Sequence, residues 1–215
     1  MLSVVIPTLN EERHIGRAIE SARAAGAAEV IISDGGSGDQ TVAIARELGA
    51  AVVEGATGRG PQQNAGAAVA SGQTLLFLHA DSWLEGAVAR PDSWGCLTQR
   101  IDAPGWRWRI LERGNNWRGR RGRPYGDQAI WCARELFDRV GGFPDWPLFE
   151  DVAIADRLRA IQLGRRLNSV VVTSPRRWQR TGIVRQTVLN RSLLAAYRCG
   201  VSPDRLAAWY RAAVH

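Results

Sequence analysis

The sequence predicts an α/β fold with a mostly parallel central sheet flanked by helices, and two observations carry that prediction. Three strand–helix units follow one another and a fourth strand closes the series, an alternation that favours right-handed crossovers between parallel strands. The fourth strand contains the apolar run Leu75–Leu78. Such a run is typical of a strand that is buried on both faces of a parallel sheet.

The elements of the first half follow in order. Residues 2–6 form a β-rich strand that ends at Pro7. A helix is expected next, with Asn10 as its N-cap and Glu11 and Glu12 in a first turn where carboxylates complement the helix dipole. The remaining elements are a strand at 29–33, a helix at about 39–48, a strand at 51–53, a loop at 58–64 and a small-residue helix at 63–71.

The second half is less regular. Between Val88 and Tyr125 the periodicity is lost, and we expect a strand or two with a partly mobile loop over the site. The tail should form two helices broken at Gly200, with Ser202 as the cap of the second and Pro203 in its first position. The elements between are a strand near 129–132, a helix at 134–140, a helix opened by residues 149–151 and a strand at 170–173.

Composition and charge narrow the class of protein. A chain of 215 residues with 45% hydrophobic and 23% charged residues is typical of a globular protein with one large core. Its three cysteines lie far apart, which favours a reducing compartment over a disulfide framework. Neither an 18-residue apolar run nor a charged leader is present, so we expect a cytoplasmic protein.

The net charge of +7 comes with arginine as the only strong cation, since the sequence contains no lysine. Such a balance favours anionic partners, although charge alone does not choose among them. Arginines alternate with apolar residues over 176–191, as in a basic amphipathic helix. Weak contact with the inner face of a membrane is therefore a further hypothesis.

Polar side chains follow three of the predicted strands. Thr8 and Glu11 follow the first strand, Asp34 the second, and His79 and Asp81 the fourth. Because the carboxyl ends of neighbouring parallel strands share one edge of the sheet, these groups should form a single site. His79 and Asp81 lie two residues apart on an extended chain, so their side chains could share one cation. The glycine-rich dinucleotide fingerprint is absent after the first strand, and the lack of lysine excludes a P-loop.

Several motifs occur in a fixed order along the chain. They are Ser3–Glu12, Asp34–Ser37 with Asp39 and Thr41, Gly58–Gly60 with Gln63–Gly66, His79–Asp81 and Glu150–Asp151. Over roughly residues 2–180 this series resembles the family-two glycosyltransferases, inverting enzymes with the GT-A fold. Residues 124–128 and 176–178 are similar to a short bacterial subgroup. The resemblance implies a GT-A domain at 1–180, with a nucleotide-binding half (1–87) and an acceptor half (88–180), followed by a helical extension at 181–215.

The resemblance also implies roles for particular residues. Asp81 matches the last aspartate of the family's D-x-D metal motif, and His79 stands at its first position, where imidazole fits Mn²⁺ better than Mg²⁺. Asp151 matches the general base, with Glu150 as its alternative. The implied nucleotide-binding residues are Pro7, Thr8, Glu11, Asp34, Arg59, Asn64 and Ala80. The implied residues of the acceptor and diphosphate side are Gln128, Arg177 and Trp178.

The expected chemistry divides these tasks between separate groups. A diphosphate leaving group needs charge neutralisation, which Mn²⁺ or Mg²⁺ with oxygen ligands supplies. A separate carboxylate must remove the proton of the acceptor hydroxyl. The implied partners are a nucleotide-diphosphate sugar, with UDP as the family's usual carrier, and a hydroxyl acceptor, for which a lipid-linked molecule is one option. A nucleic acid partner is not expected.

Two other functions fit parts of the pattern. A nucleotidyltransferase has a similar sheet but usually carries a glycine-rich loop with a basic residue after the first strand, which Pro7–Asn10 lacks. A non-catalytic nucleotide-binding protein on the same fold is the second alternative, because fold does not determine function.

Individual motifs also have plain structural interpretations. His79 could be a packed strand-end residue, and Asp81–Ser82 could cap a following helix. Residues 34–37 could be only a turn, and residues 118–123 only a solvated loop. Glu150–Asp151 could simply complement the dipole of the helix that they open.

Overall fold

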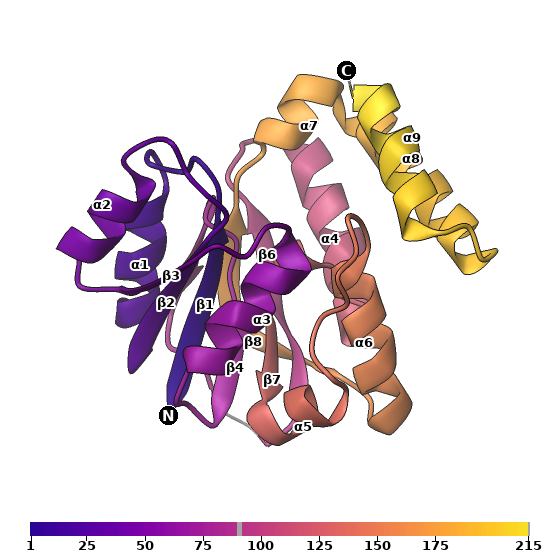
Figure 1. The fold of residues 1–215 in the computed structure, drawn as a ribbon. Coiled ribbons are helices and arrows are strands. Elements are labelled where there is room, and N and C mark those ends of the chain that lie inside the picture. The colour runs from indigo at the N-terminus through magenta and orange to yellow at the C-terminus, as the bar shows by residue number, and fades with distance from the viewer. Residues whose placement is uncertain (90–91, 215) are drawn as a thin grey trace.

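A computed structural model describes residues 1–89 and 92–214 of the chain (Figure 1). Its centre is an eight-stranded sheet with the strand order β3-β2-β1-β4-β7-β6-β8-β5. The strands are β1 (Leu2–Thr8), β2 (Glu29–Asp34), β3 (Ala51–Glu54), β4 (Thr74–Phe77), β5 (Ser82–Glu85), β6 (Trp94–Ile101), β7 (Ile130–Ala133) and β8 (Arg165–Thr173).

Helices cover both faces of this sheet (Figure 1). They are α1 (Ile15–Ala24), α2 (Thr41–Glu47), α3 (Arg59–Val69), α4 (Trp106–Arg120), α5 (Arg134–Arg139), α6 (Glu150–Ile161), α7 (Arg176–Thr181), α8 (Ile183–Arg198) and α9 (Pro203–Val214). A 3₁₀ turn, η1 (Gly126–Gln128), precedes β7. The predicted α/β class is confirmed.

The strand order brings together the three strand ends that the sequence singled out. β1 pairs in parallel with β2 on one side and with β4 on the other. Thr8 at the end of β1 lies opposite Asp34 at the end of β2. The predicted common edge is therefore confirmed. The second half adds antiparallel pairs, because β7 runs against β4 and β6, and β5 runs against β8.

The core occupies both faces of the sheet, which explains the apolar strands. Alternate side chains of a strand point to opposite faces. Val4 and Ile6 of β1 belong to the cluster that includes residues of α1, whereas Val5 belongs to the cluster that includes residues of α3, α5 and α6. Phe77 of β4 packs edge-on against Phe143 in that second cluster, with ring centroids 4.8 Å apart.

The first helix begins later than predicted, and Asn10 is not its N-cap. Helix α1 starts at Ile15, and Asn10 adopts a left-handed φ of 55°. The backbone N–H groups of Asn10, Glu11 and Glu12 donate to side chains between the end of β2 and the first residue of α2, at 2.8–3.1 Å. Residues 10–12 therefore join two strand-end loops instead of forming a first helical turn.

Two further boundaries differ from the prediction. The expected loop at 58–64 is mostly helical, because α3 begins at Arg59 and places Pro61 in its first turn, where a missing N–H removes no helical hydrogen bond. Asp81–Ser82 does not cap a helix, since Ser82 opens strand β5.

The irregular region contains a 15-residue helix that the sequence did not predict. Helix α4 turns polar residues toward the sheet. The buried Glu112 accepts a hydrogen bond from Ile101 N at 2.6 Å, and Asn115 Nδ2 donates to Gln99 Oε1 at 2.8 Å. The expectation of a loop is therefore wrong for residues 106–120, and residues 118–120 belong to this helix. Residues 90–91, which that expectation also covered, lie outside the described residues.

The predicted basic amphipathic helix over 176–191 is also wrong. Gly182, with a φ of 84°, separates α7 from α8. Arg176 of α7 pairs with carboxylates at the strand ends, whereas Arg191 of α8 lines a different cavity, between α4, α6 and α8. The arginines of 176–191 therefore do not share one face of a helix. The expected break of the tail at Gly200 and the start of α9 at Pro203 are confirmed. Within the described chain, a helix long and apolar enough to cross a membrane is not found.

Candidate functional site

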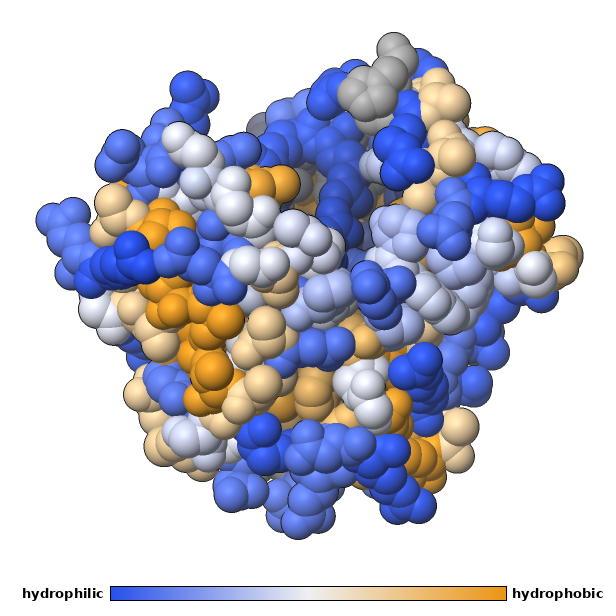
Figure 2. Space-filling model, viewed as in Figure 1, coloured by the Kyte–Doolittle hydropathy of each residue, from blue (hydrophilic) through white to orange (hydrophobic). Residues whose placement is uncertain are grey.

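A cavity of about 380 Å³ lies at the carboxyl ends of β1 and β4 and is bordered by α7. We call it the strand-end cavity. On the side shown in Figure 2, a hollow lined by hydrophilic residues separates the N-terminal half from the C-terminal helices. The predicted site residues that line the strand-end cavity are Pro7, Thr8, Glu11, Arg59, His79, Ala80, Asp81, Arg177 and Trp178.

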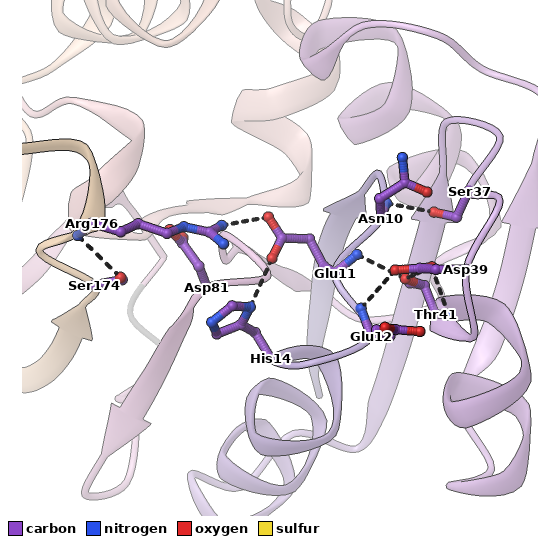
Figure 3. A network of polar contacts seen from close by, with 10 residues as sticks. All are labelled: Asn10, Glu11, Glu12, His14, Ser37, Asp39, Thr41, Asp81, Ser174 and Arg176. Atoms are coloured by element: carbon purple, nitrogen blue, oxygen red, sulfur yellow. Dashed lines mark hydrogen bonds and ion pairs between the residues drawn. The ribbon is translucent and has the colours of Figure 1, made fainter. Parts of the chain in front are cut away.

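Arg176 connects this cavity to the far end of the chain (Figure 3). Its Nε lies 3.0 Å from Asp81 Oδ2, and its Nη2 forms an ion pair with Glu11. The two carboxylates raise the pKa of Arg176 above its ordinary value, although desolvation alone would lower that pKa. This role was not predicted, because the alternation over 176–191 suggested a membrane-facing helix. The position of Arg176 beside Arg177 and Trp178 was the available signal in the sequence.

Asp34 and Asn64, both predicted to bind the nucleotide, do not line the cavity. Asp34 accepts four hydrogen bonds, from Thr8 Oγ1 at 3.0 Å, Gly36 N at 2.9 Å, Ser37 N at 2.7 Å and Ser37 Oγ. Burial alone would raise the pKa of Asp34, but these bonds lower it. Asn64 holds the backbone of Phe143 through both halves of its amide. Both residues shape the loops around the cavity.

His79 is neutral in the folded protein. Burial and the positive charge of Arg59 lower the pKa of His79 to about 3, against the opposing effect of Asp81. One ring nitrogen of a neutral imidazole carries no proton and can serve as a metal ligand. Among the described residues, a cluster of three or more His, Cys, Asp or Glu side chains that could hold a metal is not found. His79 and Asp81 fit a cation that takes most of its ligands from a bound diphosphate and water.

Glu150 and Asp151 open α6, as predicted. Glu150 is buried, and its Oε1 lies 3.7 Å from Arg59 Nη1. Burial, followed by the charge of Asp151, raises the pKa of Glu150 to about 7, while Arg59 opposes that rise. Since Arg59 also lines the strand-end cavity, this residue connects the cavity to the carboxylate pair.

Turn η1 lies between the carboxylates and the strand-end cavity. Gly126 N donates to Asp151 Oδ2 at 2.6 Å. A Cβ on Gly126 would lie 2.9 Å from His79 Nε2 and 3.3 Å from Asp151 Oδ2, so any larger residue at this position would displace one or both of these side chains. Asp127 lines the cavity, and its Oδ1 is buried without a hydrogen-bond partner among the described residues. Burial raises the pKa of Asp127, which belongs to the motif at 124–128 but was not among the predicted site residues.

Gln128, predicted to border the acceptor or the diphosphate, is fully buried beneath α4. Its Oε1 lies 3.5 Å from Arg118 Nη2, and its Nε2 has no partner in the described part of the chain. Gln128, the last residue of η1, therefore packs against α4 and does not line the strand-end cavity.

The likeness to known proteins agrees with this arrangement. The model of a family described as Glycosyl transferase family 2 matches residues 3–91. A search of curated proteins gives no significant match. Among solved structures, the mannosyltransferase PcManGT from Pyrobaculum calidifontis, in complex with GDP-Man and Mn²⁺, is similar with a TM-score of 0.64 and 19% identity, over 94% of this chain and 66% of that chain.

Two other solved structures are similar over most of the chain. TarS 1–349 from S. aureus in complex with UDP-GlcNAc has a TM-score of 0.61 and 18% identity, over 80% of this chain and 58% of that one. Glucosyl-3-phosphoglycerate synthase from Mycobacterium tuberculosis, with Mn²⁺, UDP and phosphoglyceric acid, has a TM-score of 0.55 and 20% identity, over 81% and 68%. The match spans 37% of the longer TarS chain. The chain thus has the GT-A fold, and its residues 3–91 match the model of glycosyl transferase family 2.

Proposed function

We propose that the protein is an inverting glycosyltransferase that moves a sugar from a nucleotide-diphosphate carrier to an acceptor hydroxyl. The observation that carries this proposal is the position of Arg59. Its guanidinium lines the strand-end cavity and also lies beside Glu150 of the carboxylate pair. A cavity for an anionic donor is thereby joined to a pair of carboxylates suited to base catalysis.

The strand-end cavity suits a nucleotide diphosphate. Arg59, Arg176 and Arg177 supply positive charge for the phosphates, and arginine binds phosphate oxygens through paired N–H groups. The β1 side, with Thr8 and the loop that follows it, offers hydrogen-bonding groups to a base or ribose. The GT-A structures in complex with UDP-GlcNAc and with GDP-Man support a sugar nucleotide as the donor.

The reaction is a single displacement. The acceptor oxygen forms a bond to the anomeric carbon while the bond from that carbon to the diphosphate oxygen breaks. The bonding electrons leave with the nucleoside diphosphate, and the acceptor proton passes to a carboxylate, which we assign to Asp151 with Glu150 as the alternative. Attack and departure on opposite faces of the sugar invert its configuration, so the reaction needs only one catalytic base.

Asp81 and His79 would hold a divalent cation, Mn²⁺ or Mg²⁺. When bound, it would neutralise charge on the leaving diphosphate. The Mn²⁺ present in the mannosyltransferase and synthase structures supports a metal on this fold. Asp81 forms an ion pair with Arg176, so the arginine and a bound cation would compete for the same carboxylate.

A donor screen tests the proposal. Thermal shift with UDP, GDP and their sugar derivatives, with and without Mn²⁺, should identify the carrier, and calorimetry should then give its affinity. Asp81→Ala should remove the part of that affinity that depends on Mn²⁺. Asp151→Asn should slow release of the nucleoside diphosphate by about 10²–10⁴-fold while donor binding is kept.

Asp138→Asn is the matched control, because Asp138 is an exposed carboxylate in α5 outside the strand-end cavity. If the wild type and the variants bind the donor but neither hydrolyse it slowly nor transfer its sugar, the protein is a non-catalytic binding protein. Release of pyrophosphate from a nucleoside triphosphate and a sugar phosphate would favour a nucleotidyltransferase.

A further inference from the structure

A second cavity, of about 370 Å³, lies between the C-terminal end of α4, one face of α6 and the middle of α8. Three segments that are far apart in the sequence form its walls. Its lining includes five arginines, namely Arg118, Arg121, Arg123, Arg191 and Arg198. We call it the arginine cavity.

Most of this positive charge has no counterpart. Asp156 is the only carboxylate among the lining residues, and both of its oxygens accept hydrogen bonds from Arg198, at 2.6 and 3.0 Å. Within the described residues, the guanidinium groups of Arg121, Arg123 and Arg191 form neither a hydrogen bond nor an ion pair. Like charges that converge on one concave surface raise the local concentration of anions.

The helix dipole accounts for only part of this convergence. Arg118 and Arg121 lie at the C-terminal end of α4, where cations are favoured. Arg123 lies beyond that helix, and Arg191 lies in the interior of α8. Residues from different elements therefore direct positive charge to the same cavity.

The aromatic residues of the cavity orient the guanidinium groups. Arg118 stacks over Tyr125, 3.6 Å from its ring centroid, and Arg121 stacks over Trp117 at 3.8 Å. Stacking occupies the flat face of a guanidinium and leaves its N–H edges available. Since Arg121 uses none of these N–H groups within the described chain, they can donate to a phosphate in a bidentate manner.

Apolar side chains form the rest of the lining. Val152 and Ala155 come from α6, and Leu194 comes from α8. A small inorganic anion would leave this surface in contact with water. The lining as a whole therefore matches a ligand that carries an anionic group next to an apolar portion.

The arginine cavity also lies beside the candidate base. Val152 directly follows Asp151, and Tyr125 directly precedes Gly126, whose N–H donates to Asp151. On the other side of the same turn, Asp127 lines the strand-end cavity. Turn η1 and the carboxylate thus lie between the two cavities.

We infer that the arginine cavity binds the acceptor, and that this acceptor is an amphiphile with a phosphate group. The phosphate lies among Arg121, Arg123 and Arg191, and the apolar portion contacts Val152 and Leu194. The assignment of this ligand as the acceptor rests on the proposed glycosyltransferase function, whereas the binding itself is measured without a donor.

Calorimetry with decyl phosphate, below its micelle concentration, tests the inference on the full chain. We expect saturable binding that the double substitution Arg123→Gln and Arg191→Gln weakens about tenfold or more, because each arginine donates charge-assisted hydrogen bonds. The double substitution Arg107→Gln and Arg113→Gln is the matched control, an equal charge change at exposed positions of α4 outside both cavities. Its affinity for decyl phosphate should equal that of the wild type.

Two probes separate the parts of the ligand. Decyl glucoside of equal chain length should bind far more weakly, and equal binding would overturn the anionic site. Inorganic phosphate should also bind more weakly, and an affinity equal to that of decyl phosphate would overturn the amphiphile. Absence of decyl phosphate binding, or an equal loss in the control with Arg107→Gln and Arg113→Gln, would overturn the inference as well.

Vesicles of phosphatidic acid in neutral lipid distinguish the source of the phosphate. If the wild type pellets with these vesicles and the double variant does not, the acceptor is carried by a lipid. If the wild type binds decyl phosphate but does not pellet, the acceptor is soluble. Both results agree with the inference. Binding of UDP or GDP with Mn²⁺, measured separately, reports on the strand-end cavity. If the protein binds the nucleotide but not decyl phosphate, only this inference is contradicted. If it binds decyl phosphate but not the nucleotide, the proposed function is contradicted.

Discussion

Arg176 Nε donates to Asp81 Oδ2 at 3.0 Å, across 95 positions of sequence. The same guanidinium pairs with Glu11, so that one cation from α7 joins the ends of β1 and β4. The C-terminal part of the chain thereby supplies positive charge at the carboxylate that we assign to a metal ion. If Asp81 binds a metal ion as we propose, this contact makes metal binding and the position of α7 interdependent.

Replacing Arg176 should therefore strengthen the binding of a bare metal ion. In Arg176→Ala, Asp81 and Glu11 lose their shared cation. A partly exposed ion pair is worth up to about 1 kcal/mol, so the affinity for Mn²⁺ should rise by up to about fivefold. The affinity for UDP without metal should fall, because a phosphate-binding arginine is lost. Calorimetry with each ligand measures both changes.

Arg180→Ala is the matched control, since Arg180 is an exposed arginine of the same helix without an ion pair among the described residues. Both affinities should stay at their wild-type values in that variant. If Arg176→Ala binds Mn²⁺ no better than the wild type, Asp81 and Arg176 do not compete and the assigned metal position is incorrect.

A methyl group at Gly126 should impair catalysis more than folding. The added Cβ would lie 2.9 Å from His79 Nε2 and 3.3 Å from Asp151 Oδ2, closer than packed groups normally approach. Turn η1 or the two side chains must shift, and small displacements of a base strongly reduce its rate contribution. We expect Gly126→Ala to lower turnover about 100-fold or more, measured by nucleoside diphosphate release.

Gly114→Ala provides the comparison, because a Cβ at Gly114 meets nothing within 4 Å in the interior of α4. Alanine is a better helix former than glycine, so this variant should be more stable by about 0.5–1 kcal/mol, with unchanged turnover. Equal turnover in Gly126→Ala and the wild type would place the reacting groups elsewhere.

The sequence predicted the strand-end part of this site and missed the remainder for a physical reason. Buried parallel strands carry a local signal, their apolar runs, and the polar groups that follow parallel strands share one edge of the sheet. Helix α4 lacks such a signal because Glu112 and Asn115 face the sheet and are satisfied by hydrogen bonds to β6. The Arg176–Asp81 contact depends on how distant elements pack, which periodicity does not report.

Asp34 should contribute strongly to stability at neutral pH. Its carboxylate accepts four hydrogen bonds, so the amide of Asp34→Asn would place N–H groups against donors. We expect a loss of about 1–3 kcal/mol in the free energy of unfolding, measured by urea denaturation at pH 7. Asp138→Asn, at an exposed position, should change the stability little.

The effect of Asp34 should depend on pH in a defined direction. Its pKa is lowered in the folded state, so its stabilisation is present above the unfolded pKa and is lost as pH falls through the folded pKa. The difference between wild type and Asp34→Asn should therefore shrink below about pH 4. If the difference in the free energy of unfolding is the same at pH 7 and at pH 3, the charge of the Asp34 carboxylate does not contribute to the stability.

Glu150 should show the opposite pH dependence. Its pKa is raised from 4.5 to about 7 in the folded state, chiefly by burial, so over this range the unfolded chain loses its proton first. The stabilisation from the buried, protonated acid is present below pH 4.5 and is lost as pH rises through 7, a change of about 3 kcal/mol by linkage. Glu150→Gln cannot ionise, so from pH 5 to pH 8.5 it should gain stability relative to the wild type.

Urea denaturation at both pH values measures this change, and Glu135→Gln, at an exposed position in the first turn of α5, should show none of it. The same variant decides which carboxylate is the base. If Asp151 takes the proton, Glu150→Gln keeps most of its turnover and loses an inflection near pH 7 in the profile of kcat/KM, because only the charge of its neighbour has been removed. A fall in turnover of about 10²–10⁴-fold would instead assign the base to Glu150, with Asp151 as the group that raises its pKa.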